Sequence, residues 1–135
     1  MSDRDYVQYI IVRKDLIPQM GYGKTAAQVA HASLGSILYW DTGWNIHRLH
    51  NNEATKNWLR GKFTKLVIYV KSKQKLVNLA EKLDKLEIRT KLIYDACFTS
   101  LEPEESDGTT LTCMGVEPLH RKDVPKCLSK LQLLE

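Results

Sequence analysis

Three observations predict an α/β fold for this chain, with helices packed on a central sheet. Runs rich in β-branched and aromatic residues predict four strands, at residues 6–13, 65–70, 88–94 and 109–116. Segments with apolar residues at helical spacing separate these runs, and such alternation is typical of layered α/β domains. The chain has 135 residues, 43% of them hydrophobic, which is enough for one core, so we predict a single domain over residues 1–135.

The apolar spacing predicts four helices, at residues 24–39, 45–59, 72–83 and 123–130. Ser72 is expected to cap the third helix through its hydroxyl. Residues 14–23 hold Pro18 and two glycines and are expected to form a loop. The compact run 65–70 predicts a strand that is buried on both faces, and the apolar residues 131–134 are expected to dock on the body.

The composition narrows the classes of protein to consider. The three cysteines form no CxxC pair, which argues against a structural zinc site or a disulfide framework. No run is long and apolar enough to span a bilayer, and the charged residues 1–5 lack the order of a signal peptide. We therefore predict a cytoplasmic protein that binds no membrane, no metal and no cofactor, with a mitochondrial location left open.

The net charge of +4 hides a strongly basic stretch. Residues 46–75 hold eight Lys and Arg against one Glu, with Trp58 among them and Trp44 just before, a combination compatible with RNA binding. Solvated helix faces are the plainer alternative. The candidate contacts to a nucleic-acid backbone are Arg48, Lys56, Arg60 and Lys62.

A polar stripe distinguishes the first predicted helix. Lys24, Gln28 and His31 are spaced i, i+4 and i+7, so they share one face, and the opposite face with Ala26 and Ala30 is expected to pack on the sheet. A glycine turn ending at Gly23 precedes this helix. Free N–H groups at a helix start, beside a lysine, predict a site for an anionic group.

Asp95 and Thr99 follow the strand predicted at 88–94. If that strand runs parallel to the first one, Lys24 and Asp95 meet at the same edge of the sheet. An ammonium group and a carboxylate there could polarise a carbonyl and activate a water molecule. A purely structural ion pair is an equal alternative. A cysteine hydrolase that uses Cys97 and His31 is a further alternative and requires the two side chains to approach each other.

Three segments of the sequence resemble the type 2 peptidyl-tRNA hydrolases. They are QYIIVRKDL followed by MGYGKTAAQVAHASL, then IYDACFTSLEP, and then TCMGVEP. The resemblance extends from Gln8 to Leu134. The last of these motifs is closer to the divergent subgroup called peptidyl-tRNA hydrolase domain-containing proteins.

The resemblance implies a metal-independent hydrolase that cleaves the ester between a peptide and the 3′-terminal ribose of tRNA. It implies a three-layer α/β/α sandwich on a mixed, mostly parallel sheet of about four strands, and a homodimer. It also implies functional roles for side chains of this chain. Lys24, Asp95 and Thr99 would be catalytic, and the substrate-binding residues would be Gln28, His31, Thr112 and Gly23.

The chain departs from the family pattern after Asp95. The family commonly has Gly-Arg where this chain has Cys97 and Phe98, and glycine tolerates a positive φ that other residues rarely adopt. Residues 99–112 form a longer segment with four acidic residues, which would repel tRNA phosphates unless basic residues pair with them. The alternative function is therefore an inactive relative that binds RNA or a protein partner.

Overall fold

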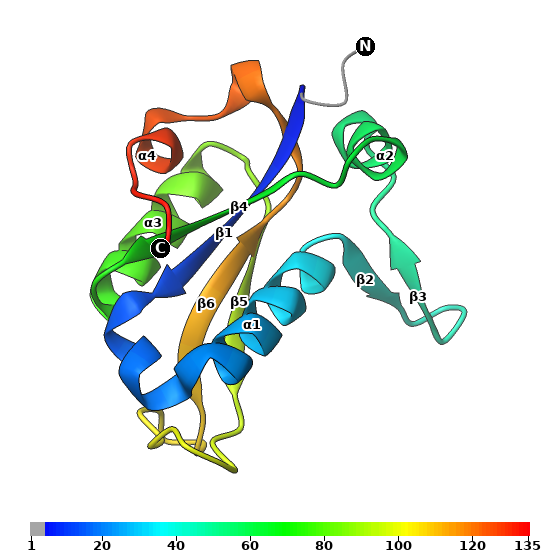
Figure 1. Ribbon diagram of the computed structural model, residues 1–135. Helices are drawn as coiled ribbons and strands as arrows, with labels where there is room; N and C mark the ends of the chain where they lie inside the picture. Colours follow the sequence, from blue (N-terminus) through cyan, green and yellow to red (C-terminus); the bar gives the residue numbers. More distant parts are fainter. Residues whose placement is uncertain (1–4) are drawn as a thin grey trace.

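The chain folds around a mixed sheet with helices on both faces (Figure 1). The structure is a computed structural model that describes residues 5–135, so most of the N-terminal segment 1–5 lies outside the described residues. The elements in chain order are β1 (Tyr6–Arg13), a 3-10 turn (Lys14–Leu16), α1 (Ile17–Gly35), β2 (Leu38–Asp41), β3 (Ile46–Leu49), α2 (Glu53–Arg60), β4 (Lys65–Val70), α3 (Lys73–Lys85), β5 (Thr90–Asp95), β6 (Thr110–Val116), β7 (Leu119–His120), a second 3-10 turn (Arg121–Asp123) and α4 (Lys126–Ser129).

The main sheet has the strand order β4-β1-β6-β5, and β7 pairs with the start of β1. β1 and β4 are parallel, whereas β6 is antiparallel to both β1 and β5. Three of the four long strands therefore run in one direction, which confirms the predicted mixed sheet, although β1–β4 is its single parallel pair among the described residues. As a result, the carboxyl ends of β1, β4 and β5 share one edge of the sheet.

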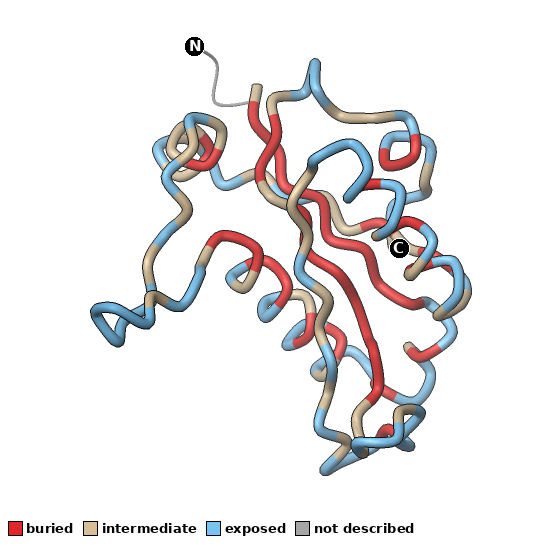
Figure 2. Tube along the Cα trace, turned by 180° about the vertical axis from the view of Figure 1, so that it is seen from behind, coloured by how far each residue is buried: buried red, intermediate tan, exposed pale blue. Residues whose placement is uncertain are grey.

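Strand β1 supplies side chains to two cores, one on each face of the sheet. Val7, Tyr9 and Ile11 pack with α3 and α4, whereas Ile10 and Val12 pack under α1. This alternation follows from the two-residue period of a strand. Figure 2 shows β1 and β6 as the longest buried stretches of the chain. The architecture is the predicted three-layer sandwich.

Helix α1 packs closely on β6 because β6 carries a glycine there. A Cβ at Gly115 would clash with the backbone carbonyl oxygen of Ala32. The close approach turns Gln28 toward the sheet and leaves Ala26 and Ala30 exposed, so the predicted orientation of this helix is wrong. The reversal is possible because the buried Gln28 amide finds a hydrogen-bond partner on β6.

The first helix also begins earlier than predicted. Residues 14–23 form a 3-10 turn and the first part of α1, with Pro18 in the first helical turn, where a missing N–H costs nothing. Gly21 has φ 73° and breaks the helical geometry, so a new helical turn begins just after it. Lys24 therefore does lie in the first turn of the segment that follows the kink.

Residues 38–49 form a hairpin that projects from the body, instead of the predicted helix over 45–59 (Figure 1). The helix observed here, α2, begins only at residue 53 and ends at residue 60. Trp44 at the hairpin turn is 72% exposed, whereas Trp58 of α2 is buried. Of the two tryptophans near the basic stretch, only Trp44 is therefore accessible to a nucleic acid.

The remaining elements agree with the prediction, except for the burial of β4. β4 is an edge strand and is only partly buried, because among residues 5–135 its partner on the outer side is the C-terminal tail alone. The docking of this tail and the Ser72 cap of α3 are confirmed. The predicted last helix is shortened to α4. No helix within residues 5–135 is long and apolar enough to cross a membrane.

Candidate active site

Lys24 and Asp95 meet at the sheet edge formed by the carboxyl ends of β1 and β5. Lys24 Nζ lies 3.0 Å from Asp95 Oδ2, and it donates a 2.6 Å hydrogen bond to Thr99 Oγ1. The side chains of Lys24 and Asp95 are 16% and 13% exposed, so both are desolvated in part and still accessible. An ammonium group has three donors, and these two contacts leave the third for a substrate oxygen.

Two residues behind the ion pair connect α1 to β6. Thr112 Oγ1 donates a 2.7 Å hydrogen bond to Gln28 Oε1, which turns Gln28 Nε2 toward Asp95 Oδ1 at 3.4 Å. Thr112 is fully buried and Gln28 is 5% exposed. Thr112 therefore has no exposed surface in this structure, and direct contact with a substrate stays a prediction for it. Its hydroxyl orients the Gln28 amide.

The backbone of Cys97 contacts Asp95 Oδ2, the same carboxylate oxygen that Lys24 contacts. The N–H of Cys97 donates to Asp95 Oδ2 at 2.9 Å, and the φ of Cys97 is 61°. The positive φ is the conformation that the family glycine would adopt without strain, whereas a residue with a Cβ loses about 1–2 kcal/mol there. An Asp whose side chain accepts from the N–H two residues on is a recognisable sequence pattern, and it could have identified this contact.

We call Lys24 and Gln28 of α1 the helix side of the site, and residues 95–110 the loop side. The acidic part of the loop side is held by basic residues. Arg13 donates to Glu104 at 2.6 Å, and Lys73 donates to Glu105 at 2.6 Å. Two of the four acidic side chains among residues 99–110 are thus paired, which reduces the repulsion that the sequence predicts.

Arg13 is a structural residue of the site that the sequence analysis missed. It is 3% exposed and also forms an ion pair with Asp15. Burial by itself lowers the pKa of the Arg13 guanidinium, but the hydrogen bonds and charges of Glu104 and Asp15 outweigh it and raise that pKa above its ordinary value. A charged residue at the end of an otherwise apolar strand was the available signal.

Two other predicted residues are exposed on α1. His31 is exposed on the next turn of α1, and Gly23 is exposed with open space where a Cβ would be built. Within the described residues, the hydrogen-bond partners of the Cys97 thiol are Asp95 O and Thr110 Oγ1, not His31. The geometry therefore gives no support to a Cys97–His31 nucleophile.

Cys113 is also unsuited to nucleophilic chemistry. Burial raises the pKa of the Cys113 thiol to about 11, although a hydrogen bond with Thr112 opposes the shift. A thiol with that pKa is almost entirely protonated near neutral pH.

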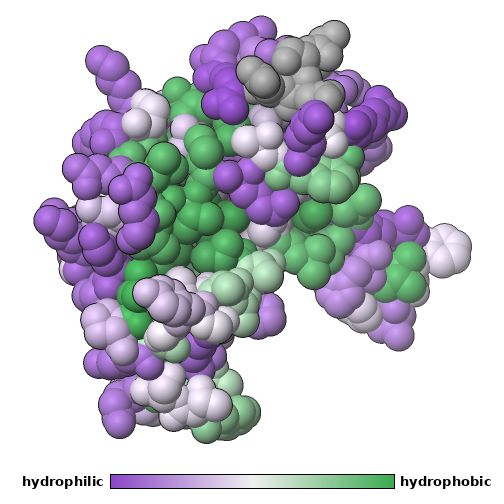
Figure 3. All heavy atoms as spheres, viewed as in Figure 1, coloured by the Kyte–Doolittle hydropathy of each residue, from purple (hydrophilic) through white to green (hydrophobic). Residues whose placement is uncertain are grey.

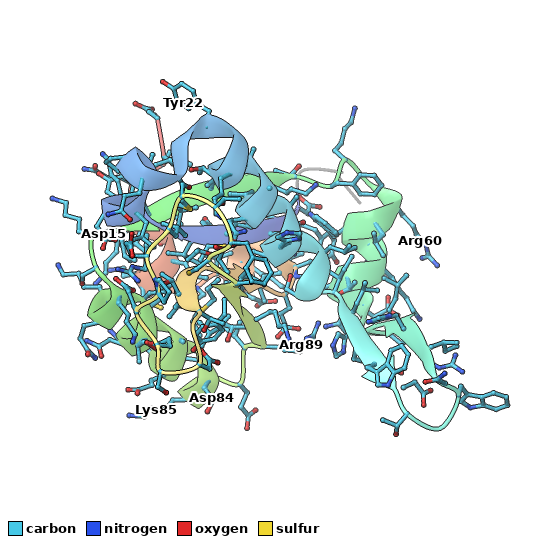
Figure 4. The ribbon with its side chains drawn as sticks, turned by 90° about the horizontal axis from the view of Figure 1, so that it is seen from below. Asp15, Tyr22, Arg60, Asp84, Lys85 and Arg89 are labelled. Atoms are coloured by element: carbon cyan, nitrogen blue, oxygen red, sulfur yellow. The ribbon has the colours of Figure 1, made fainter. Side chains whose placement is uncertain are left out.

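The four predicted contacts to a nucleic-acid backbone lie at the other end of β1. Two residues of helix α2 contact Tyr6, at the start of that strand: Asn57 donates a hydrogen bond to its hydroxyl, and Trp58 packs in the same apolar cluster. Figure 4 shows Arg60 on the opposite side of the molecule from Asp15, which follows the end of β1. The set comprises Arg48 on β3, paired with Asp41, then Lys56 and Arg60 on α2, and Lys62 just after it. The structure does not bring them to Lys24 and Asp95.

The arrangement suits attack of water on an ester. A carboxylate held by Lys24, Gln28 and the Cys97 N–H can orient a water molecule and accept its proton. A lysine beside it can stabilise the negative charge that develops on the carbonyl oxygen. Thr99, bonded to the same lysine, is exposed and available to a substrate.

Comparison with known proteins agrees with this geometry. The family model described as peptidyl-tRNA hydrolase PTH2 matches residues 6–134. The chain belongs to this family. The match confirms the resemblance found in the sequence. It covers the five side chains that meet at the site, which are Lys24, Gln28, Asp95, Thr99 and Thr112.

Curated relatives cover the PTH2 chain almost end to end. A peptidyl-tRNA hydrolase of Methanopyrus kandleri is 35% identical, over 96% of this chain and 98% of its own. Those of Sulfurisphaera tokodaii and Saccharolobus solfataricus are 37% and 33% identical, over 93% of this chain and 95% and 96% of their own.

Proposed function

We propose that this chain is an active peptidyl-tRNA hydrolase and that Lys24, Asp95 and Thr99 carry the reaction. The observation that supports the proposal is the 3.0 Å contact between Lys24 Nζ and Asp95 Oδ2, within a member of the PTH2 family. The substrate is a peptide, or an N-blocked amino acid, esterified to the 3′-terminal ribose of tRNA.

In the proposed reaction, Asp95 takes a proton from a water molecule whose oxygen attacks the ester carbonyl. The third N–H of Lys24 stabilises the oxyanion. When the carbonyl re-forms, the bond to the ribose oxygen breaks and that oxygen receives the proton from Asp95. The products are the free peptide acid and tRNA. Positioned proton transfer of this kind contributes roughly 10²- to 10⁴-fold in rate.

Gln28 and Thr112 position the Asp95 carboxylate in this proposal. The exposed residues His31 and Gly23 stay predicted substrate contacts. A homodimer and a location in the cytoplasm, both expected at the outset, likewise stay predictions.

The test is release of tRNA from N-acetyl-aminoacyl-tRNA by the wild-type chain and by Asp95→Asn. We expect turnover by the wild type and a loss of about 10²- to 10⁴-fold in kcat for the variant, because asparagine cannot accept the proton. Asp84→Asn is the matched control, since Asp84 is an exposed carboxylate on α3 (Figure 4). Absence of wild-type turnover would contradict the proposal and favour an inactive binding module.

A further inference from the structure

A groove with lysines on its rim runs between α3 and the C-terminal tail. Two adjoining hollows of about 250 and 260 Å³ share Val70, Lys75, Lys130 and Leu131 as walls. Because they share these walls, they form one continuous depression, which we call the lysine groove. Figure 3 shows apolar side chains gathered over β4 and the tail, with hydrophilic side chains beside them on the α3 side.

The lysine groove has a one-sided charge. Its lining includes Lys71, Lys75, Lys82 and Lys130, and none of the described residues that line it is acidic. Lys14 adds a fifth ammonium group, 4.3 Å from the centre of the Tyr69 ring on the groove wall. In the described part of the chain, none of the five lies within ion-pair distance of a carboxylate. Like charges repel one another, so apart from the contact of Lys14 with the Tyr69 ring this cluster opposes folding.

The first turn of α3 strengthens the positive potential. Ser72 caps this 13-residue helix, and the first turn holds lysines and no acidic residue. Helix starts carry partial positive charge and ordinarily favour Asp or Glu, so lysines there are unfavourable unless an anion is present. Glu105 supplies that anion for Lys73, whereas Lys75 has no carboxylate partner among the described residues. Helix geometry and side-chain charge therefore both point to an anionic occupant.

One end of the lysine groove, at Val70 and Lys71, reaches the same edge of the sheet as the candidate active site. The groove is on the α3 face of the sheet, whereas α1, which carries Lys24, covers the other face. Lys73, next to the groove, forms its ion pair with Glu105 on the loop side of the site. From β5 to β4 the sheet order includes three strand spacings, which is roughly 14 Å. Double-stranded nucleic acid carries one phosphate charge about every 1.7 Å along its axis, so several phosphates fall within that span.

We propose that the lysine groove binds the phosphate backbone of tRNA while the 3′ end of the tRNA lies at Lys24 and Asp95. The proposal rests on the proposed function, because it places the same substrate. It moves the backbone contacts away from Arg48, Lys56, Arg60 and Lys62, which lie at the other end of β1. In this arrangement the lysines of the groove bind the tRNA phosphates, and Lys24 and Asp95 cleave the ester.

Two triple variants with the same change in net charge test the proposal. Lys71→Gln/Lys75→Gln/Lys130→Gln removes three charges from the groove, and Arg48→Gln/Lys56→Gln/Arg60→Gln removes three from the hairpin and α2. The measurements are binding of uncharged tRNA by fluorescence anisotropy between 50 and 200 mM salt (about the range over which such contacts respond), and KM and kcat on N-acetyl-aminoacyl-tRNA. All six side chains are on the surface or half-buried, and thermal melting checks that the variants fold.

For the groove variant we expect tRNA binding about tenfold weaker near 150 mM salt, with the slope of log K against log salt reduced by about 2–3. We expect KM to rise and kcat to stay unchanged. The hairpin variant is expected to bind within about twofold of the wild type.

Three results would overturn the proposal. The two variants could lose tRNA affinity equally, the groove variant could bind tRNA as tightly as the wild type does, or the wild-type chain could bind a poly-glutamate peptide as tightly as tRNA. A groove variant that binds normally, beside an inactive Asp95→Asn, would reject the groove and leave the proposed function standing. If the groove variant binds tRNA more weakly but the wild-type chain shows no turnover, the groove is supported and the proposed function is rejected.

Discussion

The helix side and the loop side of the candidate site are built in opposite ways. On the helix side, Gln28 is 5% exposed and lies on a regular helix that is held against β6. On the loop side, Cys97 has a positive φ and Phe98 is 91% exposed. The helix side is fixed mainly by packing, whereas the loop side combines the buried Leu101 and the partly buried Cys97 with polar contacts. The departures from the family pattern are at Cys97 and Phe98, on the loop side.

The Asp95 carboxylate joins the two sides. It accepts from Lys24 and Gln28 on one side and from the N–H of Cys97 on the other. The N–H contact depends on backbone geometry and not on the identity of the side chain. The loop side can therefore change its residues and still hold the carboxylate, which explains how the site keeps its geometry with Cys97 in place of glycine.

The largest loss of activity is expected from a change on the helix side, Lys24→Met. Methionine keeps an unbranched chain but removes the ammonium group, so both the ion pair to Asp95 and the bond to Thr99 are lost. We expect kcat on N-acetyl-aminoacyl-tRNA to fall by about 10²- to 10³-fold. Lys85→Met, at the exposed end of α3 (Figure 4), is the control. A fall of less than threefold would show that the helix side carries no chemistry.

A smaller effect is expected from Thr112→Val. Valine matches the shape of threonine but cannot donate to Gln28 Oε1, so the amide is no longer held toward Asp95. We expect a drop in kcat of about tenfold, in line with the loss of one hydrogen bond, and an unchanged KM. Thr112→Ser restores the hydroxyl and should restore kcat. A rise in KM with kcat intact would instead mean that Thr112 meets the substrate.

The smallest effect is expected at Cys97. Cys97→Gly removes the strain of a positive φ, so we expect a gain in stability of about 0.5–1 kcal/mol, or about 2–4 °C in Tm. Activity should stay within about twofold, because the N–H to Asp95 is retained. Cys97→Ala keeps the Cβ and removes the thiol, so it should gain nothing. Equal melting temperatures for both variants would show that the thiol contacts, and not strain, set the stability of the loop side.

The sequence predicted the elements whose signals are local. β1 and β4 are apolar runs with clear ends, and the Ser72 cap of α3 lies directly before a helical apolar pattern. It missed the start of α1, because Pro18 and Gly21 were interpreted as loop residues although proline suits a first helical turn. The hairpin over 38–49 was missed because its Asp-Thr-Gly turn between aromatic and β-branched residues was not weighed as a strand signal.

Within the site, the helical spacing of Lys24 and Gln28, together with the condition that the strand before Asp95 runs parallel to β1, predicted a common location. The contact from Thr112 to Gln28 was beyond sequence reasoning, since it depends on how closely α1 approaches β6. That distance is set by Gly115, a residue with no chemistry of its own. The partner of Arg13 was equally out of reach, because Glu104 lies 91 residues away in the chain, although a charge at the end of β1 was a visible signal.

The C-terminal tail has a consequence for how this protein behaves in a crowded solution. Leu134 N–H donates to Val67 O, and Tyr69 N–H donates to Gln132 O, so residues 132–134 cover the open side of β4. An uncovered strand of this kind offers its backbone to other chains and is a common starting point for aggregation. The opposite border of the sheet, β5, carries the exposed Lys91, a charge that discourages such pairing. The molecule thus protects one border by covering it and the other by charge, and loss of the last few residues should make it prone to self-association.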